Sequence, residues 1–446
     1  MKLLLNSTNY SQKGIQKKQQ EYTFITDKER ENELLNLHPE VEYQRFEGFG
    51  GALTDAAGYV YSQMSGDDKK RMLDAYFSEK GIGYNRVRIP IDSCDFSVEQ
   101  FQAVTDKEDL EFKTFSLERE KKYIYPLWED IKRLSADVEV MVTPWSPPDF
   151  MKMNEERIQG GSLKEEYKGV YAEYLCRYIE ELQKTGIPVK RMSIQNEPKA
   201  VQTWDSCIMS SEEEKVFLRD YLYPAMEKHE LTNVEIFIWD HNKERVFERA
   251  CAIIDDTTAH MVKGIAFHWY SGDHFEELQM VKEKFPFLKL ILSEACIEYS
   301  KFGADEELNN VKKYAHEIIG NLNAGMNAFY DWNILLDESG GPNHVGNFCD
   351  APFLYHTGDK KLEERMTLSA IEHFGKYIKP DAVRIGHSRY TDDIEVTAFK
   401  NPDGSIAVVM LNQTEKALPV TLRIKDECVS LELTACSIST GIITEW

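Results

Sequence analysis

The sequence has no long hydrophobic run. Its N-terminus, MKLLLNSTNYSQKGIQKKQQ, has only three successive leucines before Asn6, far fewer than the apolar core of a signal peptide. No stretch approaches the roughly 18 apolar residues that a membrane-spanning helix needs. We therefore expect neither an export signal nor a membrane span, and we expect a cytoplasmic protein.

Closely spaced cysteine pairs are also absent. Eight cysteines are scattered from Cys94 to Cys436, and no two of them form a C-x-x-C pair. In a chain of this length without an export signal, this pattern indicates reduced and mostly buried thiols rather than a disulfide framework.

Positive charge is in short supply. The chain has 53 Lys and Arg against 76 Asp and Glu, which gives a formal net charge of -23. Nucleic acids and anionic membranes would be repelled by such a surface, so we expect no nucleic-acid partner and no stable membrane association. A small neutral or cationic substrate remains compatible. The oligomeric state stays open.

Eight short apolar or alternating segments recur along the chain, most of them separated by helical patterns. They are Phe46–Leu53, Asn85–Ile91, Val138–Thr143, Val189–Gln195, Val234–Trp239, Gly264–Trp269, Leu288–Ser293 and Met326–Trp332. Several are rich in Val and Ile, as buried parallel strands are. Strand–helix alternation repeated eight times predicts an α/β fold, a (β/α)₈ TIM barrel, rather than an open sheet.

The C-terminal part of the chain has a different pattern. From about Tyr377 it is strand-like, with a hairpin predicted around Asn401-Pro402-Asp403-Gly404. We therefore predict a barrel over residues 43–376 and a β-sandwich side domain over 377–446. Part of the segment 1–42 has no place in the barrel and is expected to join the sandwich.

Two glutamates follow barrel strands at nearly opposite places in the ring. Glu197 ends the fourth strand, in MSIQNEP, and Glu294 ends the seventh, in SEACIE. Barrel enzymes carry their chemistry at these strand ends. Two carboxylates facing one pocket suit glycoside hydrolysis, in which one protonates the leaving oxygen and the other attacks or activates water.

Aromatic residues gather at the same strand ends and offer faces for a sugar ring. They are Trp145, Trp204, Trp269, Tyr270 and Trp332. Any one of them alone would be interpreted as core packing. Their clustering near the two glutamates favours a sugar site.

Other patterns favour different functions more weakly. The histidines His241, His268, His274 and His344 lack a metal-ligand spacing such as H-E-x-x-H. The glycine-rich GFGGALTDAAG lacks the lysine of a phosphate loop, so we interpret it as a tight turn after the first strand. A non-catalytic sugar-binding barrel is disfavoured because both glutamates are present. An aldolase would need a lysine at a strand end.

Seven blocks in register resemble glycoside hydrolase family 30, and most closely its glucosylceramidase-type branch among the clan A retaining β-glycosidases. The blocks are FEGFGGALTDAAG, GYNRVRIPIDSCDFS, TPWSPPDFMK, IQNEP, HWYSGD, SEACIE and DWNILLDESGGPNHVGNFCDAP. They run in order from Phe46 to Pro352, so the likeness covers the whole predicted barrel.

The resemblance implies a retaining β-glycosidase in which Glu197 is the acid/base and Glu294 the nucleophile. It also implies that Asp95 and Trp145 bind hydroxyls of the innermost sugar, and that Asn196 contacts its 2-hydroxyl. The remaining candidate substrate-binding residues are Trp204, His268, Tyr270, Trp332 and Asn347.

The two glutamates are expected to differ in protonation. Glu197 must carry a proton to act as an acid, so we expect a partly apolar wall and the charge of Glu294 to raise its pKa. Glu294 must stay ionised, and Tyr270 is a candidate hydrogen-bond donor to it. Glu298, two residues beyond Cys296, is the rival nucleophile.

The expected activity is hydrolysis of terminal β-linked glucose, with β-xylosidase and β-1,6-glucanase activities as alternatives. The substrate would be a small β-glycoside or oligosaccharide, and no cofactor or metal is expected. Because the sequence predicts a cytoplasmic protein, whether glucosylceramide itself is hydrolysed stays open.

Overall fold

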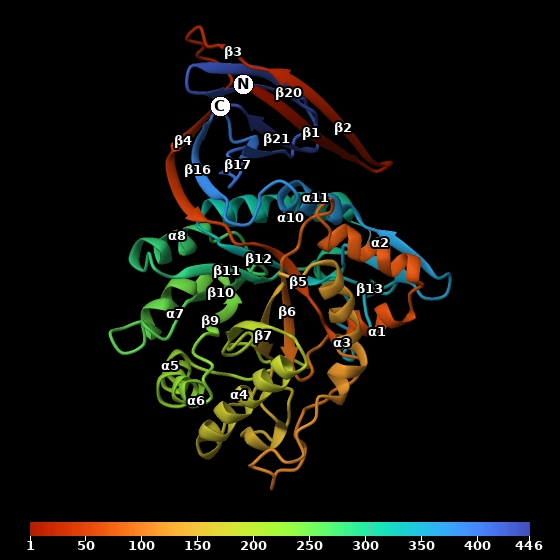
Figure 1. The fold of residues 1–446 in the computed structure, drawn as a ribbon, viewed down its shortest axis with the longest axis vertical. Helices are drawn as coiled ribbons and strands as arrows, with labels where there is room; N and C mark the ends of the chain where they lie inside the picture. Colours follow the sequence, from red (N-terminus) through yellow and green to blue (C-terminus); the bar gives the residue numbers. More distant parts are fainter. Residues whose placement is uncertain (305) are drawn as a thin grey trace.

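Eight parallel strands close into a barrel within residues 1–304 and 306–446, which the computed structural model describes (Figure 1). The barrel strands are β5 (Gly48–Ala52), β6 (Arg86–Ile91), β7 (Glu139–Pro144), β8 (Val189–Ser193), β9 (Glu235–Asn242), β10 (Gly264–His268), β11 (Lys289–Glu294) and β12 (Ala328–Asn333). Their order around the ring follows the chain, and β12 pairs with β5 to close it. The predicted TIM barrel is confirmed.

The eight strands agree closely with the segments that the sequence predicted. The one clear difference is β9, which continues past the predicted end at Trp239 to Asn242. Because of this extension, Asp240, His241 and Asn242 reach the carboxyl end of the barrel.

Helices cover the outside of the barrel. They are α1 (Asp55–Gln63), α2 (Gly66–Phe77), α3 (Glu118–Leu134), α4 (Lys168–Lys184), α5 (Ser211–Phe217), α6 (Tyr223–Lys228), α7 (Val246–Ile253), α8 (Phe275–Lys284), α9 (Tyr299–Phe302) and α10 (Glu307–Asn323), with short helical turns η1 (Asp149–Met151), η2 (Glu165–Tyr167), η3 (Leu218–Leu222) and η4 (Lys243–Arg245). Local sequence sets their ends. Thr54 caps α1 by accepting the Ala57 N–H, and Gly186, just past α4, adopts a φ of 86°.

The glycines that the sequence assigned to a turn after the first strand lie mainly in the strand itself. Gly48–Ala52 form β5, Leu53 and Thr54 connect it to α1, and the segment ends inside α1. A Cβ on Gly50 would lie 2.1 Å from the carbonyl oxygen of Arg86 in β6. Glycine is therefore required by close backbone approach inside the barrel wall.

The second unit is the predicted β-sandwich, and N-terminal strands join it. Its strands are β1 (Lys2–Ser11), β2 (Gly14–Thr23), β3 (Ile25–Thr26), β4 (Leu34–Arg45), β16 (Val383–Arg389), β17 (Ile394–Lys400), β18 (Ile406–Asn412), β19 (Leu418–Ile424), β20 (Glu427–Leu433) and β21 (Ser437–Thr444), hydrogen-bonded in the order β2-β1-β21-β18-β17-β16-β4-β19-β20-β3. The predicted hairpin joins β17 to β18. A small sheet of β13 (Leu336–Asp337), β14 (Phe353–His356) and β15 (Lys361–Glu364) follows the barrel.

Helices α10 and α11 (Met366–Gly375) lie between the barrel and the sandwich (Figure 1). One hydrophobic core runs through this junction, because Ile371 and Phe374 of α11 belong to the same buried cluster as Val409 and Ile438 of the sandwich. Burial of a shared apolar surface of this kind holds the two units together.

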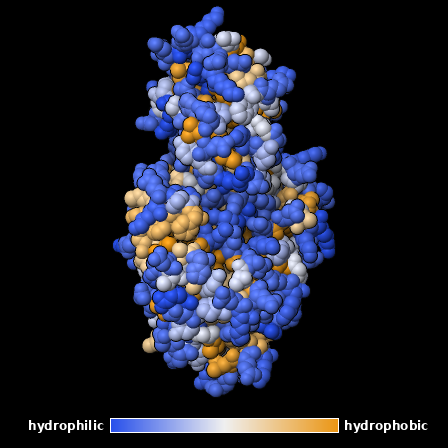
Figure 2. Space-filling view, turned by 60° about the vertical axis from the view of Figure 1, so that its left-hand side comes forward, coloured by the Kyte–Doolittle hydropathy of each residue, from blue (hydrophilic) through white to orange (hydrophobic). Residues whose placement is uncertain are grey.

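The surface is mostly polar, in keeping with the acidic composition. Figure 2 shows one largely hydrophilic face on which apolar residues form separate patches. Among the residues that the structure describes, no helix combines the length and apolarity that crossing a membrane requires.

Candidate active site

A cavity of about 360 Å³ lies at the carboxyl ends of the barrel strands. Asn196 and Glu197 follow β8, Glu294 ends β11, and Trp332 lies in β12. Its volume is at the small end of the range for ligand pockets, about 300–1,000 Å³. The cavity is therefore suited to a small ligand.

Arg88 is the fixed centre of this site. Its fully buried guanidinium donates to Glu294 Oε2 (2.7 Å), Asn196 Oδ1 (3.0 Å) and Asp240 Oδ2 (2.9 Å). Charge-assisted bonds from one planar group set the relative positions of its acceptors. Because Arg88 donates to the side-chain oxygen Oδ1 of Asn196, the side-chain NH₂ of Asn196 is left to face the cavity.

Glu197 has a strained backbone. A residue before a proline usually has extended geometry, but φ of Glu197 is 46°, in the left-handed region. Tertiary hydrogen bonds override the local preference: Glu197 N–H donates to Asp240 O (2.9 Å), and Ala200 N–H donates to Glu197 O (2.8 Å). Strain of this kind is maintained where the surroundings fix a functional side chain.

Glu294 is held by two donors on different sides. Tyr270 Oη donates to Glu294 Oε1 (2.9 Å), as the sequence predicted, and Arg88 donates to Oε2. Tyr270 also contacts Cys296 Sγ at 3.3 Å. Burial is the main cause that raises the pKa of Tyr270 well above its ordinary value, so this phenol stays a donor.

His268 links both glutamates to a buried aspartate. Its Nδ1 lies 3.1 Å from Glu197 Oε1 and 3.9 Å from Glu294 Oε1, and its Nε2 lies 3.1 Å from Asp240 Oδ1. Burial opposes protonation, but the surrounding carboxylates outweigh it and raise the pKa of His268 to about 9. The imidazole therefore carries a proton at neutral pH.

The pKa of Glu197 shifts in the direction opposite to the sequence-based expectation. Burial by itself would raise it, but the contacts with His241 and His268 outweigh burial and hold the pKa below its ordinary value. The predicted rise is wrong because imidazoles, rather than an apolar wall, face this carboxylate.

The floor of the cavity is aromatic. The rings of Trp145 and Trp332 stack with centroids 5.0 Å apart, and the Arg88 guanidinium lies 4.7 Å from the Trp145 ring. Such rings offer flat apolar surface beside polar groups.

Asp95 lies at the same end of the cavity as these rings. Burial first, and then the charge of Glu294, raise its pKa well above the usual range. The amide of Asn347 lies 3.5 Å from Asp95 Oδ2, and His344 N–H donates to Asp95 O at 3.3 Å. The loop that carries these two residues therefore covers this end.

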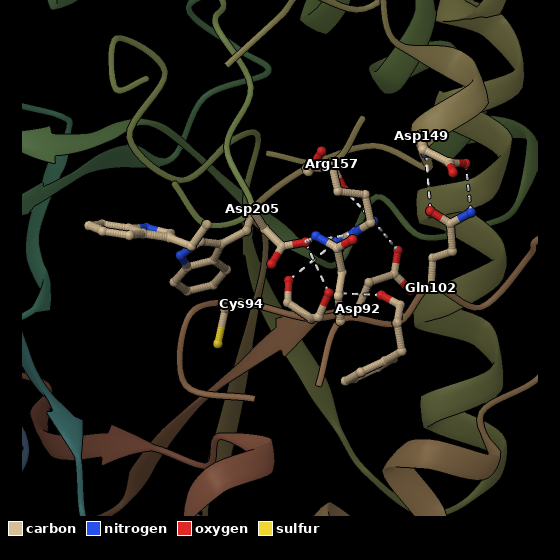
Figure 3. Close-up of polar contacts among 12 residues, drawn as sticks. Asp92, Cys94, Gln102, Asp149, Arg157 and Asp205 are labelled. Atoms are coloured by element: carbon tan, nitrogen blue, oxygen red, sulfur yellow. Dashed lines mark hydrogen bonds and ion pairs between the residues drawn. The ribbon is translucent and has the colours of Figure 1, made fainter. Parts of the chain in front are cut away.

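A polar cluster ties together the loops beside the cavity. Figure 3 shows Arg157 between Asp92 and Asp205, with Gln102 and Asp149 paired next to it. Arg157 Nε donates to Asp205 Oδ1 (2.6 Å), and Nη1 lies 3.5 Å from Asp92 Oδ2. All three side chains are buried. The loops after β6, β7 and β8 are thus joined through one guanidinium.

Nine of the ten predicted site residues line the cavity. They are Asp95, Trp145, Asn196, Glu197, Trp204, Tyr270, Glu294, Trp332 and Asn347. The tenth, His268, is fully buried behind Glu197 and is not part of the cavity wall. Trp269, also considered as a sugar-stacking face, is buried against Tyr314 instead. The rival carboxylate Glu298 lines the mouth and pairs with Lys301 at 3.0 Å.

Sequence reasoning missed Arg88, Asp240 and His241. The rule that located the glutamates would have found the last two, because both lie at the end of β9. The signal for Arg88 was a charged residue inside a strand that is buried on both faces. A buried charge requires a partner.

A larger cavity, of about 620 Å³, lies against α2, β2 and α11. Most of its charged residues are already paired, as in Lys17 with Glu372 (2.6 Å) and Arg365 with Glu307 (2.8 Å). The smaller cavity is the better candidate site because its two carboxylates face open space beside aromatic rings.

One set of residues in the described part of the chain has the geometry of a metal site. Ligand atoms of Glu197, His241 and His268 all lie within 4.8 Å of one another. Cys94, Cys296 and Cys349 are buried near the same cavity as free thiols, and burial is the main cause that raises the pKa of Cys296. High-pKa thiols are poor nucleophiles.

A TIM barrel with two carboxylates facing one cavity at its strand ends is the arrangement expected of a glycoside hydrolase. The chain belongs to glycosyl hydrolase family 30. Residues 46–378 match the glycosyl hydrolase family 30 TIM-barrel domain, and residues 381–441 match the glycosyl hydrolase family 30 beta sandwich domain.

Curated relatives include enzymes of more than one kind. The chain is 31% identical to lysosomal acid glucosylceramidase of Mus musculus over 409 residues, which covers 87% of this chain and 79% of the relative. It is 24% identical to an endo-1,6-beta-D-glucanase of Neurospora crassa over 406 residues, covering 87% and 82%.

Solved structures are similar along the whole chain. SrfJ from Salmonella typhimurium is 34% identical, with a TM-score of 0.96 and full coverage of both chains. The endo-beta1,6-glucanase BT3312 is 26% identical, with a TM-score of 0.89 and full coverage of both.

Proposed function

We propose that the protein is a retaining β-glycosidase that removes terminal β-linked glucose from short, soluble β-glucosides. The observation that carries this proposal is the carboxylate pair. His268 Nδ1 is 3.1 Å from Glu197 Oε1 and 3.9 Å from Glu294 Oε1, so these oxygens are at most about 7 Å apart, compatible with the roughly 5–5.5 Å between carboxyl groups of retaining enzymes.

Glu294 is the proposed nucleophile. Tyr270 and Arg88 donate to its two oxygens, which fixes the orientation of the carboxylate. Attack on the anomeric carbon breaks the bond to the leaving oxygen and forms a covalent glycosyl-enzyme.

Glu197 is the proposed acid/base. Its hydrogen bond with His268 holds one proton between the two side chains, and Glu197 delivers that proton to the leaving oxygen. In the second step Glu197 takes a proton from the attacking water, and the Glu294–sugar bond breaks. The carboxylates supply all the proton and covalent chemistry, so the proposed reaction uses no metal and no organic cofactor.

Substrate contacts follow from what lines the cavity. Asn196 is positioned by Arg88 to donate to a hydroxyl next to the anomeric carbon, and such bonds strengthen in the transition state. Asp95 and Trp145 are proposed to bind the outer hydroxyls of the same sugar. The loop carrying His344 and Asn347 contacts Asp95, which supports a closed end and therefore release of single sugars.

A second candidate is endo-acting β-1,6-glucanase activity. It is supported by the similarity to the endo-beta1,6-glucanase BT3312, whose structure matches this one over the full chain. Lysosomal acid glucosylceramidase supports the glucosidase proposal and adds a lipid glucoside to the substrates worth testing.

The test is a panel of nitrophenyl β-glycosides together with β-1,6-linked gluco-oligosaccharides and a short-chain glucosylceramide in micelles. We expect the β-glucoside to be hydrolysed fastest, and glucose to be released from oligosaccharides from the earliest time points. Early accumulation of mid-length products would support the endo-glucanase instead. Preference for the β-xyloside would contradict both candidates.

A further inference from the structure

We propose that Glu197, His241 and His268 bind a divalent transition-metal ion of the zinc and copper class, and that this ion reversibly inhibits the enzyme. Two imidazoles and one carboxylate are ligands that zinc and copper accept. The proposed hydrolysis has no use for the ion, so the site is a point of inhibition rather than part of the reaction.

The spacing of the ligand atoms fits a tetrahedral ion. Glu197 Oε1 lies 3.1 Å from His268 Nδ1 and 3.5 Å from His241 Nδ1. Metal–ligand bonds of about 2.0–2.1 Å in a tetrahedron place neighbouring ligand atoms about 3.3 Å apart. The two observed separations lie on either side of this value, and the two imidazole nitrogens lie within 4.8 Å of each other, so side-chain rotations that bring the imidazoles together would complete the site.

Asp240 prepares His268 as a ligand. Metal binding would displace the proton on Nδ1 of His268, while Nε2–H stays donated to Asp240 Oδ1 (3.1 Å) and keeps Nδ1 facing Glu197. A carboxylate behind a metal-binding histidine fixes the tautomer and raises its affinity for metal. Asp240 is itself held by Arg88 and Ser293, so the orientation of His268 is set before any ion binds.

His241 supplies the second, independent observation. Its Nδ1 is shielded from solvent and, among the described residues, finds no aligned hydrogen-bond partner. The 3.5 Å approach to Glu197 Oε1 is long and poorly directed. A buried nitrogen that points at a carboxylate without a good hydrogen bond is unusual, and an ion between the two atoms would satisfy it.

Charge at this place favours a cation. Three carboxylates meet here, the buried Asp240 and Glu294 and the half-buried Glu197. Arg88 is the one permanent cation that contacts them within residues 1–304 and 306–446. Glu197 and His241 line the cavity, so the fourth coordination position would face the space for substrate.

Binding and inhibition are separable claims. Binding depends on the three ligands alone. Inhibition rests on the proposed acid/base role of Glu197, because an ion on its Oε1 would occupy the lone pair that carries the catalytic proton. Substrate and ion would also compete for the mouth of the same cavity.

The test begins with metal-stripped full-length protein. A titration with zinc sulfate, monitored by isothermal calorimetry, should show one tight site. Co²⁺ added instead of Zn²⁺ should give the visible absorption of a tetrahedral complex. Cu²⁺ should bind more tightly than Zn²⁺, and Mg²⁺ should not bind. His241→Gln and His268→Gln should each weaken Zn²⁺ binding by about tenfold or more.

Two control variants separate this site from other sources of metal affinity. His229 lies outside the cavity and contacts Glu173 and Glu180 of α4 at 2.7 Å each. His229→Gln should therefore leave Zn²⁺ affinity unchanged. Cys349→Ala removes a sulfur from the wall of the same cavity and should also leave it unchanged. Zinc binding that survives both His241→Gln and His268→Gln, or that disappears in Cys349→Ala, would overturn the proposal.

Activity gives the second readout. For each protein that hydrolyses the nitrophenyl β-glucoside, Zn²⁺ should inhibit wild type and His229→Gln equally, and a chelator should restore the starting rate. Inhibition constants of His241→Gln should rise in parallel with its binding constant. Binding without inhibition would contradict the inhibitory claim, whereas absence of glycosidase activity in metal-free wild type would contradict the proposed function and leave the calorimetric result standing.

Discussion

Arg88 is the residue on which the geometry of the candidate site depends. It joins Glu294, Asn196 and Asp240 through one guanidinium and lies against the ring of Trp145. A lysine could neutralise one carboxylate but could not reach three acceptors in one plane.

Replacing this arginine is expected to destabilise the protein. Arg88→Met leaves buried carboxylates without their cation, which should cost about 3–5 kcal/mol in the free energy of unfolding. Arg88→Lys should lose less stability but most of the activity. Urea unfolding followed by tryptophan fluorescence measures the first effect. As a control, Arg219→Met removes a more exposed pair with Asp220 and should lower the free energy of unfolding far less than Arg88→Met does. An unfolding curve for Arg88→Met that matches wild type would contradict this account.

The proposed roles of the two glutamates predict opposite products. In Glu294→Ala, azide can fill the vacated space and attack an activated β-glycoside once, giving an α-glycosyl azide. In Glu197→Ala, Glu294 still forms the covalent intermediate from substrates whose leaving group needs no proton, and azide then gives the β-azide. Nuclear magnetic resonance of the products distinguishes the two anomers.

Glu298→Ala is the matched control for these variants. Its carboxylate lines the mouth of the cavity but pairs with Lys301, so the variant should keep substantial activity and give no glycosyl azide. Reversed anomers, or azide rescue of Glu298→Ala, would show that the assignment is wrong.

At the residue scale, the sequence predicted the residues that line the cavity better than the buried residues that hold them in place. The glutamates and tryptophans could be found because they follow strands and are exposed to a ligand. Arg88 could not be ranked in this way, since its importance comes from partners that lie far away in the chain. Only folding brings those partners together.

At the scale of elements, α10 and α11 connect the barrel to the sandwich through histidines as well as apolar contacts. His373 of α11 is buried between Thr8 of β1 and Thr440 of β21, at 2.8 Å from each hydroxyl. Burial is the main cause that lowers the pKa of His373 to about 3. The folded protein therefore keeps this imidazole neutral in mild acid.

This contact predicts a pH dependence of stability. The unfolded chain protonates His373 below about pH 6.5, whereas the folded protein does so only near pH 3, so the unfolded state binds more protons in between. As the pH is lowered across that window, His373 should reduce the free energy of unfolding by about 1.4 kcal/mol for each pH unit. His373→Gln can keep both threonine contacts and should lack this slope. Urea unfolding of both proteins from pH 7 to pH 4 measures it, and equal slopes would contradict the prediction.

Strands were predictable from their apolar patterns, and the extension of β9 was not. The pairing of β9 with β10 shifts register between Ala266 and Phe267, and Trp239 and Asp240 have positive φ angles of 75° and 51°. Such a bulge interrupts the alternation of side chains that identifies a strand. The pattern therefore ends at Trp239 although the strand continues into the site.

At the scale of the whole molecule, the sandwich covers apolar surface of the barrel. Ile371 and Phe374 of α11 lie in one buried cluster with Val409 and Ile438. A chain that ends at residue 378 should expose this surface, bind 8-anilinonaphthalene-1-sulfonate and precipitate more readily than the full chain. Fluorescence of the dye and soluble yield measure the effect. A soluble, active barrel without dye binding would show that the two units are independent.

The Arg157 cluster has a consequence for how this enzyme could be changed. Its guanidinium links loops from three strands, and Asp205 also lies 3.6 Å from His344 in a fourth loop. A length change in any one of these loops would displace the others, so they can diverge only together. The segments after β10 and β11 lie outside this cluster in the described structure, and they include Tyr270 and Lys301 on the opposite lip of the cavity. Mutant libraries designed to change the leaving-group preference should therefore vary residues 271–274 and 299–303. They should leave the loops after β6, β7 and β8 and the loop carrying His344 unchanged.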